Sequence, residues 1–479
     1  MHDFDDGTKT GALDLKQTDS FNIRSMPTPL LILLSILGVG LAFMGAFAPQ
    51  LSGIVLIIVL LAIVSYHFPY FGIALNLNGT YLLTHTFAIA ELESGILLSL
   101  RFIMIVSLIK ISKEGNLRFP TEQKTNIVYI LLGFLWLLLG VIYSDASGYG
   151  TLKALRYLAM NATVFMLPLF IRWSQVTFVS LLKGLTIVGA VAGWISLVFI
   201  LYNGLNLSER VFLMEEVNVI WISRAMGISI ISIFGLLILK QKDHITLFLL
   251  LSLPGLISSM LLSGSRGPIL ALVLALGAIV IFMERRKKST IIYLIVGLII
   301  MMSMGLMILY LTSSSIRLLT DPTQLDKDIS ALHRVIAWLK SFELIGQNLI
   351  AGIGTGGFRS VGNQLFPWLP TNIYAYPHNI FIEIWMENGI IGLLLLFFPI
   401  IKIAFWESRL NKLPSFHNQS IAFGLLVFAV INAQVGGDLT MNEGIWFSAG
   451  ILAALSFSVE EKEFYTTSTI QETQDGYGQ

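Results

Sequence analysis

The fold is decided near the start of the chain, where the sequence of residues 29–66 is PLLILLSILGVGLAFMGAFAPQLSGIVLIIVLLAIVSY. This run belongs to a longer segment, from Ser25 to Ala90, that contains no Asp, Glu, Lys or Arg. A helix of about 20 apolar residues crosses a bilayer, because the backbone polar groups find no water there and must pair with one another. The segment is therefore predicted to cross a membrane two or three times.

The composition of the whole chain agrees with a membrane protein. Of the 479 residues, 55% are hydrophobic and 12% are charged, whereas soluble domains contain about 25% charged residues. A net charge of +1 argues against a protein that binds nucleic acid through its phosphates. The absence of cysteine excludes disulfides, thiolate catalysis and thiolate metal sites.

The expected fold is all-α: a polytopic transmembrane helix bundle. Apolar segments of spanning length occupy approximately residues 28–47, 50–67, 94–112, 126–144, 154–171, 177–201, 219–239, 245–262, 268–283, 291–312, 379–401, 419–436 and 443–458. A weaker pass near 70–89 contains Asn76, Asn78 and Gly79, so the expected number of spans is about 12–14.

Lys and Arg concentrate in the connections 110–124, 240–242, 285–288 and 402–412. The positive-inside rule places these connections in the cytoplasm. The resulting division is a cytoplasmic tail (1–27), an N-terminal transmembrane bundle (28–312), an extracytoplasmic loop (313–377), C-terminal transmembrane helices (378–458) and a disordered cytoplasmic tail (459–479).

The extracytoplasmic loop contains one stretch with helical periodicity. Between Ala331 and Gln347, apolar residues recur at the spacing of a helix face, and Arg334, Lys340 and Glu343 lie on other faces. An amphipathic helix on the outer membrane surface is expected there.

Two features on the outer side are candidates for anion or ligand binding. Arg266 lies in SGSRGP, residues 263–268, where small neighbours leave the guanidinium open to an anion or, alternatively, to lipid headgroups. Arg334 precedes the glycine-rich run AGIGTGGF, residues 351–358. Gly354 and Gly356 there allow close backbone approach to a ligand; the alternative is a flexible turn between two helices, which is the usual role of such a run.

The third feature is YPHNIFIE, residues 376–383, followed by MENGIIG, residues 386–392. His378 can both accept and donate a proton near neutral pH, or it can contact lipid headgroups. Glu383 and Glu387 lie in an apolar run, where carboxylates are paired or functional. Arg224, at the start of another span, is a secondary candidate for the same site; the alternative is a partner for Glu215 or Glu216, or a lipid phosphate.

The His378-Asn379 pair and the later GIIG element, residues 389–392, resemble the signature of the O-antigen ligase and polymerase superfamily. SRG at 265–267, the Arg334 to Trp338 element and the glycine-rich turn are similar to its other landmarks and follow in the same order. The resemblance covers residues 265–392 by motif. Residues 347–349 depart from the pattern, because a proline often precedes the glycines in the family.

This resemblance implies an inverting, metal-independent glycosyltransferase without a cofactor, whose donor is a polyprenyl-pyrophosphate-linked glycan. Arg266 and Arg334 would bind the donor pyrophosphate, and His378 would take the proton of the acceptor hydroxyl. Asn379, Glu383, Gly354 and Gly356 are secondary site residues.

The expected function is polymerisation of lipid-linked repeat units into a surface polysaccharide at the outer face of the bacterial plasma membrane. A ligase that transfers lipid-linked glycan to another acceptor uses the same chemistry, and a transporter or flippase of lipid-linked sugars is an alternative of another class. Expected partners are the donor, a glycan or lipid-linked acceptor, membrane lipids, a flippase and a chain-length regulator, but no nucleic acid.

Overall fold

The structure is a computed structural model, and it describes residues 49–83, 90–203, 219–263, 265–283, 329–367, 376–407 and 416–456. The chain divides into two compact units, residues 1–60 and 61–479. Regular structure in the described residues is helical, apart from one isolated backbone bridge between Leu117 and Ile171. The predicted all-α class is confirmed.

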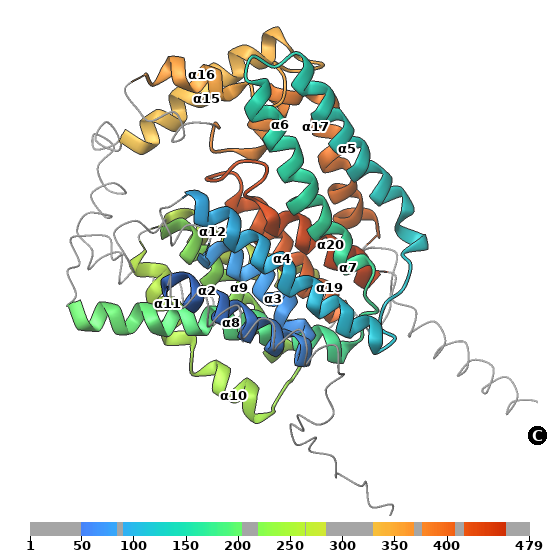
Figure 1. The fold of residues 1–479 in the computed structure, drawn as a ribbon, viewed down its shortest axis with the longest axis vertical. Coiled ribbons are helices and arrows are strands. Elements are labelled where there is room, and N and C mark those ends of the chain that lie inside the picture. Colours follow the sequence, from blue (N-terminus) through green and yellow to red (C-terminus); the bar gives the residue numbers. More distant parts are fainter. Residues whose placement is uncertain are drawn as a thin grey trace, which may run out of the picture. The chain divides into compact units, whose positions relative to one another are not determined.

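The helices are drawn in Figure 1. In chain order they are α2 (Pro49–His67), α3 (Pro69–Leu83), α4 (Ala90–Lys113), η2 (Thr121–Gln123), α5 (Lys124–Ile142), α6 (Ser147–Arg156), η3 (Tyr157–Ala162), α7 (Thr163–Leu169), α8 (Gln175–Asn203), α9 (Val219–Ile238), α10 (His244–Leu250), α11 (Leu253–Leu262), α12 (Arg266–Met283), α15 (Ile329–Gln347), α16 (Phe358–Leu365), α17 (Ile380–Lys402), η5 (Ile403–Glu407), α19 (Phe416–Asn432) and α20 (Glu443–Ser456).

Within the described residues, six helical segments are long and apolar enough to cross a membrane, and four shorter apolar helices accompany them. Their outward faces are apolar too: on α4, Leu98, Phe102 and Ile109 are exposed, whereas Leu100 and Ile103 are buried. Such continuous apolar surfaces are unfavourable in water and suited to lipid. The protein is therefore an integral membrane helix bundle.

The number of spans stays a prediction, because two of the expected ones, residues 28–47 and 291–312, lie outside the described residues. The same holds for both tails and for residues 313–328 and 368–375 of the expected extracytoplasmic loop. The domain boundaries proposed from the sequence are likewise untested.

The weak pass expected near 70–89 contains helix α3, whose polar residues are buried and bonded. Asn78 Nδ2 donates to Leu185 O at 2.9 Å, and Asn76 accepts a hydrogen bond from Arg101 on α4. Arg101 also pairs with Glu443, with 2.8 Å between Nη2 and Oε2. A charge inside a membrane bundle is tolerated when it is paired in this way, so these polar residues mark contacts between helices.

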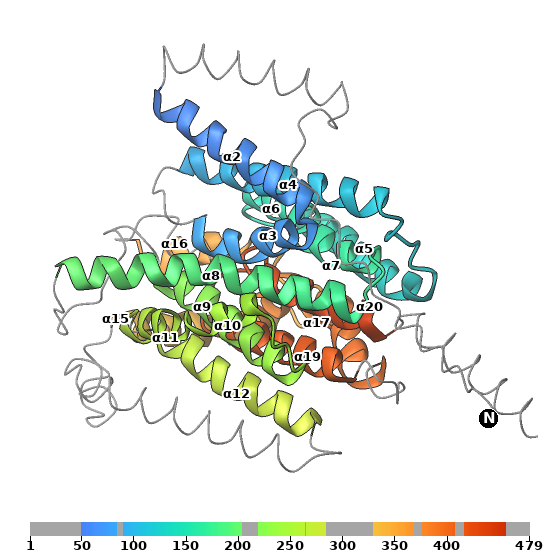
Figure 2. The ribbon, with the colours of Figure 1, turned by 90° about the horizontal axis from the view of Figure 1, so that it is seen from below.

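Helix α8 runs alongside α9 (Figure 2), and small residues set their separation. A Cβ atom on Gly189 would lie 1.9 Å from Ser229 Oγ. Ser229 Oγ donates to Leu185 O at 2.9 Å. Lipid gives little hydrophobic drive for helix association, so close packing and interhelical hydrogen bonds of this kind hold such bundles together.

The amphipathic helix expected at 331–347 is confirmed as α15, which lies beside α16 and the beginning of α17 (Figure 1). Ala337 and Ile345 on its inner face join Phe358 and Met386 in one small apolar core. Leu339 and other apolar residues of a second face are exposed. This packing connects α15, the glycine-rich turn and α17, the segments that carry the predicted site.

Candidate active site

The His378-Asn379 pair forms the beginning of α17. The Asn379 side-chain oxygen accepts hydrogen bonds from the backbone N–H groups of Phe381 and Ile382, both at 3.1 Å, so Asn379 is the N-cap. His378, just before it, has a φ of +57°. The left-handed region costs a non-glycine residue roughly 1–2 kcal/mol, and such strain is concentrated at functional sites.

Helix α15 places Arg334 next to this cap. Trp338, one turn further along, donates Nε1–H to Pro377 O at 2.7 Å and so ties the helix to the residue before His378. The ring of His378 meets Tyr376 edge-on, with 4.6 Å between centroids. Burial lowers the pKa of His378 to about 3, and the charge of Arg334 adds to the lowering. The imidazole is therefore neutral at neutral pH.

Tyr376 lies between cations and carboxylates. Burial raises the pKa of its hydroxyl above the ordinary value, and Asp438 and Glu383 raise it further. The positive charges of Arg224 and Arg334 act in the opposite direction. The neighbourhood of His378 thus contains groups from α9, α15, α17 and the connection between α19 and α20.

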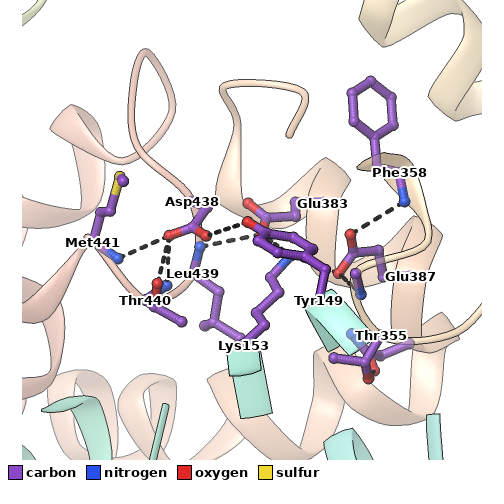
Figure 3. A network of polar contacts seen from close by, with 12 residues as sticks. Tyr149, Lys153, Thr355, Phe358, Glu383, Glu387, Asp438, Leu439, Thr440 and Met441 are labelled. Carbon is purple, nitrogen blue, oxygen red and sulfur yellow. Dashed lines mark hydrogen bonds and ion pairs between the residues drawn. The ribbon is translucent and has the colours of Figure 1, made fainter. Parts of the chain in front are cut away.

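A buried ionic cluster lies one turn into α17 (Figure 3). Lys153 of α6 places its Nζ 2.5 Å from Glu383 Oε1 and 2.6 Å from Glu387 Oε2. At most 1% of each of the three side chains is exposed. Removing one partner from such a cluster leaves an uncompensated buried charge and is strongly destabilising.

The two carboxylates also bind backbone amides of neighbouring segments. Leu439 N–H donates to Glu383 Oε1 at 3.2 Å. Glu387 accepts from Gly356 N–H at 2.9 Å and from Phe358 N–H at 3.4 Å. The cluster therefore joins α6 and α17 to the glycine-rich turn and to the 433–442 connection.

Asp438 organises the 433–442 connection. Its Oδ1 accepts from the backbone N–H groups of Thr440 and Met441, both at 2.9 Å, and from the Thr440 hydroxyl. Tyr149 of α6 donates its hydroxyl to Asp438 Oδ2 at 3.4 Å (Figure 3). The Arg359 guanidinium stacks over the Tyr149 ring at 4.5 Å.

Arg224 is held by the same connection. The side chain is 1% exposed, and its Nη2 donates to Asn432 O at 2.7 Å and to Gly436 O at 2.9 Å. Its Nη1 donates to Asn442 Oδ1, and its guanidinium stacks on Trp221. These contacts give Arg224 a role in holding the 433–442 connection beside Tyr376. Its expected alternative partners, Glu215 and Glu216, lie outside the described residues.

The glycine-rich turn approaches protein backbone closely. Gly354 N–H donates to Glu387 O at 2.8 Å, and a Cβ on Gly354 would lie 2.6 Å from Ser144 Cα. A Cβ on Gly356 would lie 2.9 Å from Gly150 Cα. The turn packs between α17 and the α5–α6 connection, and contact of these glycines with a ligand stays a prediction.

Helix α17 is kinked where the turn meets it. Gly389 has a φ of +64° and a ψ of −172°, and Ile390 N–H leaves the helix pattern to donate to Leu349 O at 3.0 Å. A Cβ on Gly389 would lie 1.9 Å from Ile350 O. Only glycine combines this backbone conformation with so close an approach.

We expect Gly389→Ala to destabilise the protein by about 3 kcal/mol or more, because both the positive φ and the backbone contact exclude a methyl group. The measurement is the apparent melting temperature in detergent. Gly346→Ala is the control, since Gly346 in α15 has no atom within 4 Å of a built Cβ. Equal melting temperatures for the two variants would contradict the packing described here.

The structure thus brings Arg334, His378, Asn379 and Glu383 to the beginning of α17, and the charges of Arg224 and Arg334 both act on Tyr376. Arg266 is the first residue of α12, and its side chain is outside the described atoms. No group of three or more His, Cys, Asp or Glu side chains in the described ranges could hold a metal ion.

Part of the chain that contains these motifs matches a known family. Residues 245–397 match the sequence model of the family described as O-antigen ligase. Over these residues the chain is similar to the O-antigen ligase family, which supports the O-antigen ligase and polymerase superfamily. A comparison with curated proteins gave no match.

This match supports a membrane enzyme of the O-antigen ligase or polymerase type. The matched region runs from α10 to α17 and contains Arg266, Arg334, the glycine-rich turn and His378. Helix α6 and the 433–442 connection, which supply Lys153 and Asp438, lie outside it.

Three residues close to the candidate site are not indicated by any motif in the sequence: Tyr149, Lys153 and Asp438. The signal for Lys153 was indirect, because Glu383 and Glu387 are four residues apart in an apolar helix and so need a cation. Nothing in the sequence identified α6 as the source of that cation.

Proposed function

We propose that this protein is an inverting glycosyltransferase that polymerises polyprenyl-pyrophosphate-linked oligosaccharide repeat units into a surface polysaccharide. The observation that carries the proposal is geometric: His378 lies at the capped beginning of α17, and Trp338 of α15 binds the preceding Pro377 and so holds the helix that carries Arg334 beside it. A base and a fixed cation are the two groups that transfer from a pyrophosphate donor needs.

In the proposed reaction, His378 takes the proton of an acceptor hydroxyl while the hydroxyl oxygen attacks the anomeric carbon from the face opposite the leaving group. The bond between that carbon and the pyrophosphate oxygen breaks, and the electron pair leaves with the polyprenyl pyrophosphate. Arg334 and Arg266 offset the developing negative charge, because guanidinium groups bind phosphates in a bidentate manner without a metal. Arg266, at the N-terminus of α12, is placed where helix amides also favour anions.

We propose that the site faces outward from the bacterial plasma membrane. The basic connections predict this orientation. Nucleotide sugars and ATP are absent on that side, so the energy for transfer must come from a donor already activated on a lipid. A polyprenyl-pyrophosphate glycan meets that requirement.

A polymerase is favoured over a ligase because a ligase of this type requires a lipopolysaccharide acceptor, to which no feature of the sequence points. Transport of lipid-linked sugars is less consistent with the site. The proposed groups gather at the beginning of one helix, whereas transporters usually bind their substrate between repeated halves near the bilayer midplane.

The test is reconstitution of the purified protein with a lipid-linked repeat unit. We expect long polymer, produced at an unchanged rate in the presence of a strong chelator, since two arginines and no metal ion neutralise the pyrophosphate. A single transfer to a distinct acceptor would make the protein a ligase. Loss of activity that only a divalent ion restores would contradict the role given to the arginines, and movement of the donor without transfer would indicate a transporter.

A further inference from the structure

Two series, or lines, of contacts start at the ionic cluster of Lys153, Glu383 and Glu387. The first line leads to His378: Glu383 pairs with Lys153, and Glu383 N–H donates to the carbonyl of the cap residue Asn379 at 2.9 Å. Asn379 directly follows His378. Glu383 also binds Leu439 N–H, so this line fixes the 433–442 connection against the beginning of α17.

The second line leads to Arg334. Glu387 pairs with Lys153 and binds the amides of Gly356 and Phe358. The side chain of Phe358 packs in one apolar core with Ala337 of α15. Arg334 lies one turn before Ala337 on the same helix, so its position depends on this core.

Figure 3 shows Lys153 extending from α6 to both carboxylates. The side chains of Lys153, Glu383 and Glu387 are buried, with N–O distances of 2.5 and 2.6 Å, and among the described ion pairs they form the one cluster in which one cation bridges two carboxylates. A displacement of about 1 Å at a reacting group can cost about 100-fold in rate. A rigid ionic junction between the base and the cation is therefore a means of fixing their separation.

We propose that Lys153 is a positioning residue for glycosyl transfer, which acts through Glu383 on His378 and through Glu387 on Arg334. This inference rests on the proposed function, because it assumes that His378 and Arg334 serve the same reaction. It assigns to Lys153 a role beyond the stability of the bundle.

The two lines predict different kinetic effects. Glu383→Gln weakens the link to His378, so we expect kcat to fall about tenfold while the KM for the lipid-linked donor changes less than twofold. Glu387→Gln weakens the link to Arg334, so we expect the KM for the donor to rise about tenfold. Each variant leaves Lys153 with one carboxylate partner. The glutamine oxygen of Glu383→Gln can still accept from Leu439 N–H, whereas Glu387→Gln keeps an acceptor for only one of the Gly356 and Phe358 amides.

A triple variant, Lys153→Met with Glu383→Gln and Glu387→Gln, removes the three charges of the junction together, while Asp438 keeps its bonds to Thr440, Met441 and Tyr149. Replacing a whole buried ionic group is often neutral for stability, so we expect a folded protein with kcat/KM reduced about 100-fold. The matched control is Lys183→Met with Asp243→Asn, which removes a 2.9 Å ion pair between α8 and the beginning of α10. We expect the control to retain wild-type rates.

Two results would overturn the proposal and leave Lys153 a purely structural role. One is a folded triple variant with wild-type kinetics. The other is that the two single variants have equal effects on kcat and KM. If the triple variant does not fold, the two single variants decide by the same criterion. A wild-type protein that transfers no glycan would instead overturn the proposed function, so the two failures are distinguishable.

Discussion

Replacing His378 by alanine is expected to lower the rate of glycosyl transfer by about 10²- to 10⁴-fold, the usual contribution of a general base. The imidazole is the group next to Arg334 that can take the acceptor proton, and its burial keeps it neutral. The measurement is polymer formation in proteoliposomes, with the lipid-linked single units expected to accumulate on the outer leaflet. Accumulation on the inner leaflet would favour a transporter.

The control for this variant is His244→Ala. His244 is an exposed histidine at the first residue of α10. We expect it to leave the transfer rate unchanged. If the two variants have equal rates, His378 is not the base.

The pH dependence of the same reaction follows from the lowered pKa of His378. Its value of about 3 in the folded protein lies below the ordinary 6.5, so the base is already deprotonated at pH 6. The pH dependence of kcat/KM reports the groups of the free enzyme. We therefore expect kcat/KM to be constant between about pH 6 and pH 8. Its decrease at acidic pH, the acidic limb, should lie well below pH 6.5. A limb centred near 6.5 would mean that the catalytic base is an exposed, unperturbed histidine.

Replacing Arg334 by glutamine is expected to lower kcat/KM for the lipid-linked donor by about 10²- to 10³-fold, as the loss of one preorganised group that stabilises developing charge usually does. Arg334→Lys should restore little of the activity, because an ammonium cannot bind a phosphate in a bidentate manner. Kinetics with purified donor measure both effects.

Arg334→Gln should also move the acidic limb of the pH profile upward, since the charge of Arg334 is one cause of the low pKa of His378. The control is Lys340→Gln, which removes a cation from the same helix, where it pairs with Glu343 at 2.7 Å. If Arg334→Gln changed neither the acidic limb of the pH profile nor the rate, Arg334 would neither bind the donor nor lower the pKa of His378.

The beginning of α17 was predictable from the sequence to a useful degree. A proline, a histidine and an asparagine directly before an apolar run indicate the capped beginning of a helix. The burial of the His378 imidazole was not predictable from this pattern. The periodicity of 331–347 predicted α15, and Arg334 was singled out with it. Sequence spacing could not show that Trp338 binds Pro377 and thereby brings Arg334 to His378.

The glycine-rich turn shows why the contacts of the other candidate site residues were less predictable from the sequence. Four nearby glycines indicate that something approaches the backbone closely, but the sequence does not tell ligand from protein. The structure places the backbone of α17 there, at the kink of Gly389. Arg224 is a similar case, because a cation at the start of a span can meet a substrate, a carboxylate or, as here, backbone carbonyls.

The sequence by itself determined that this chain is an α-helical membrane protein, since lipid offers the backbone no partners and long apolar runs must then form helices. It also determined which motifs lie at the ends of those helices. Only the tertiary structure decided that Lys153 bridges Glu383 and Glu387, the last of them 234 residues away. A buried charge takes whatever partner the packing of distant helices brings to it, and local spacing holds no information about that packing.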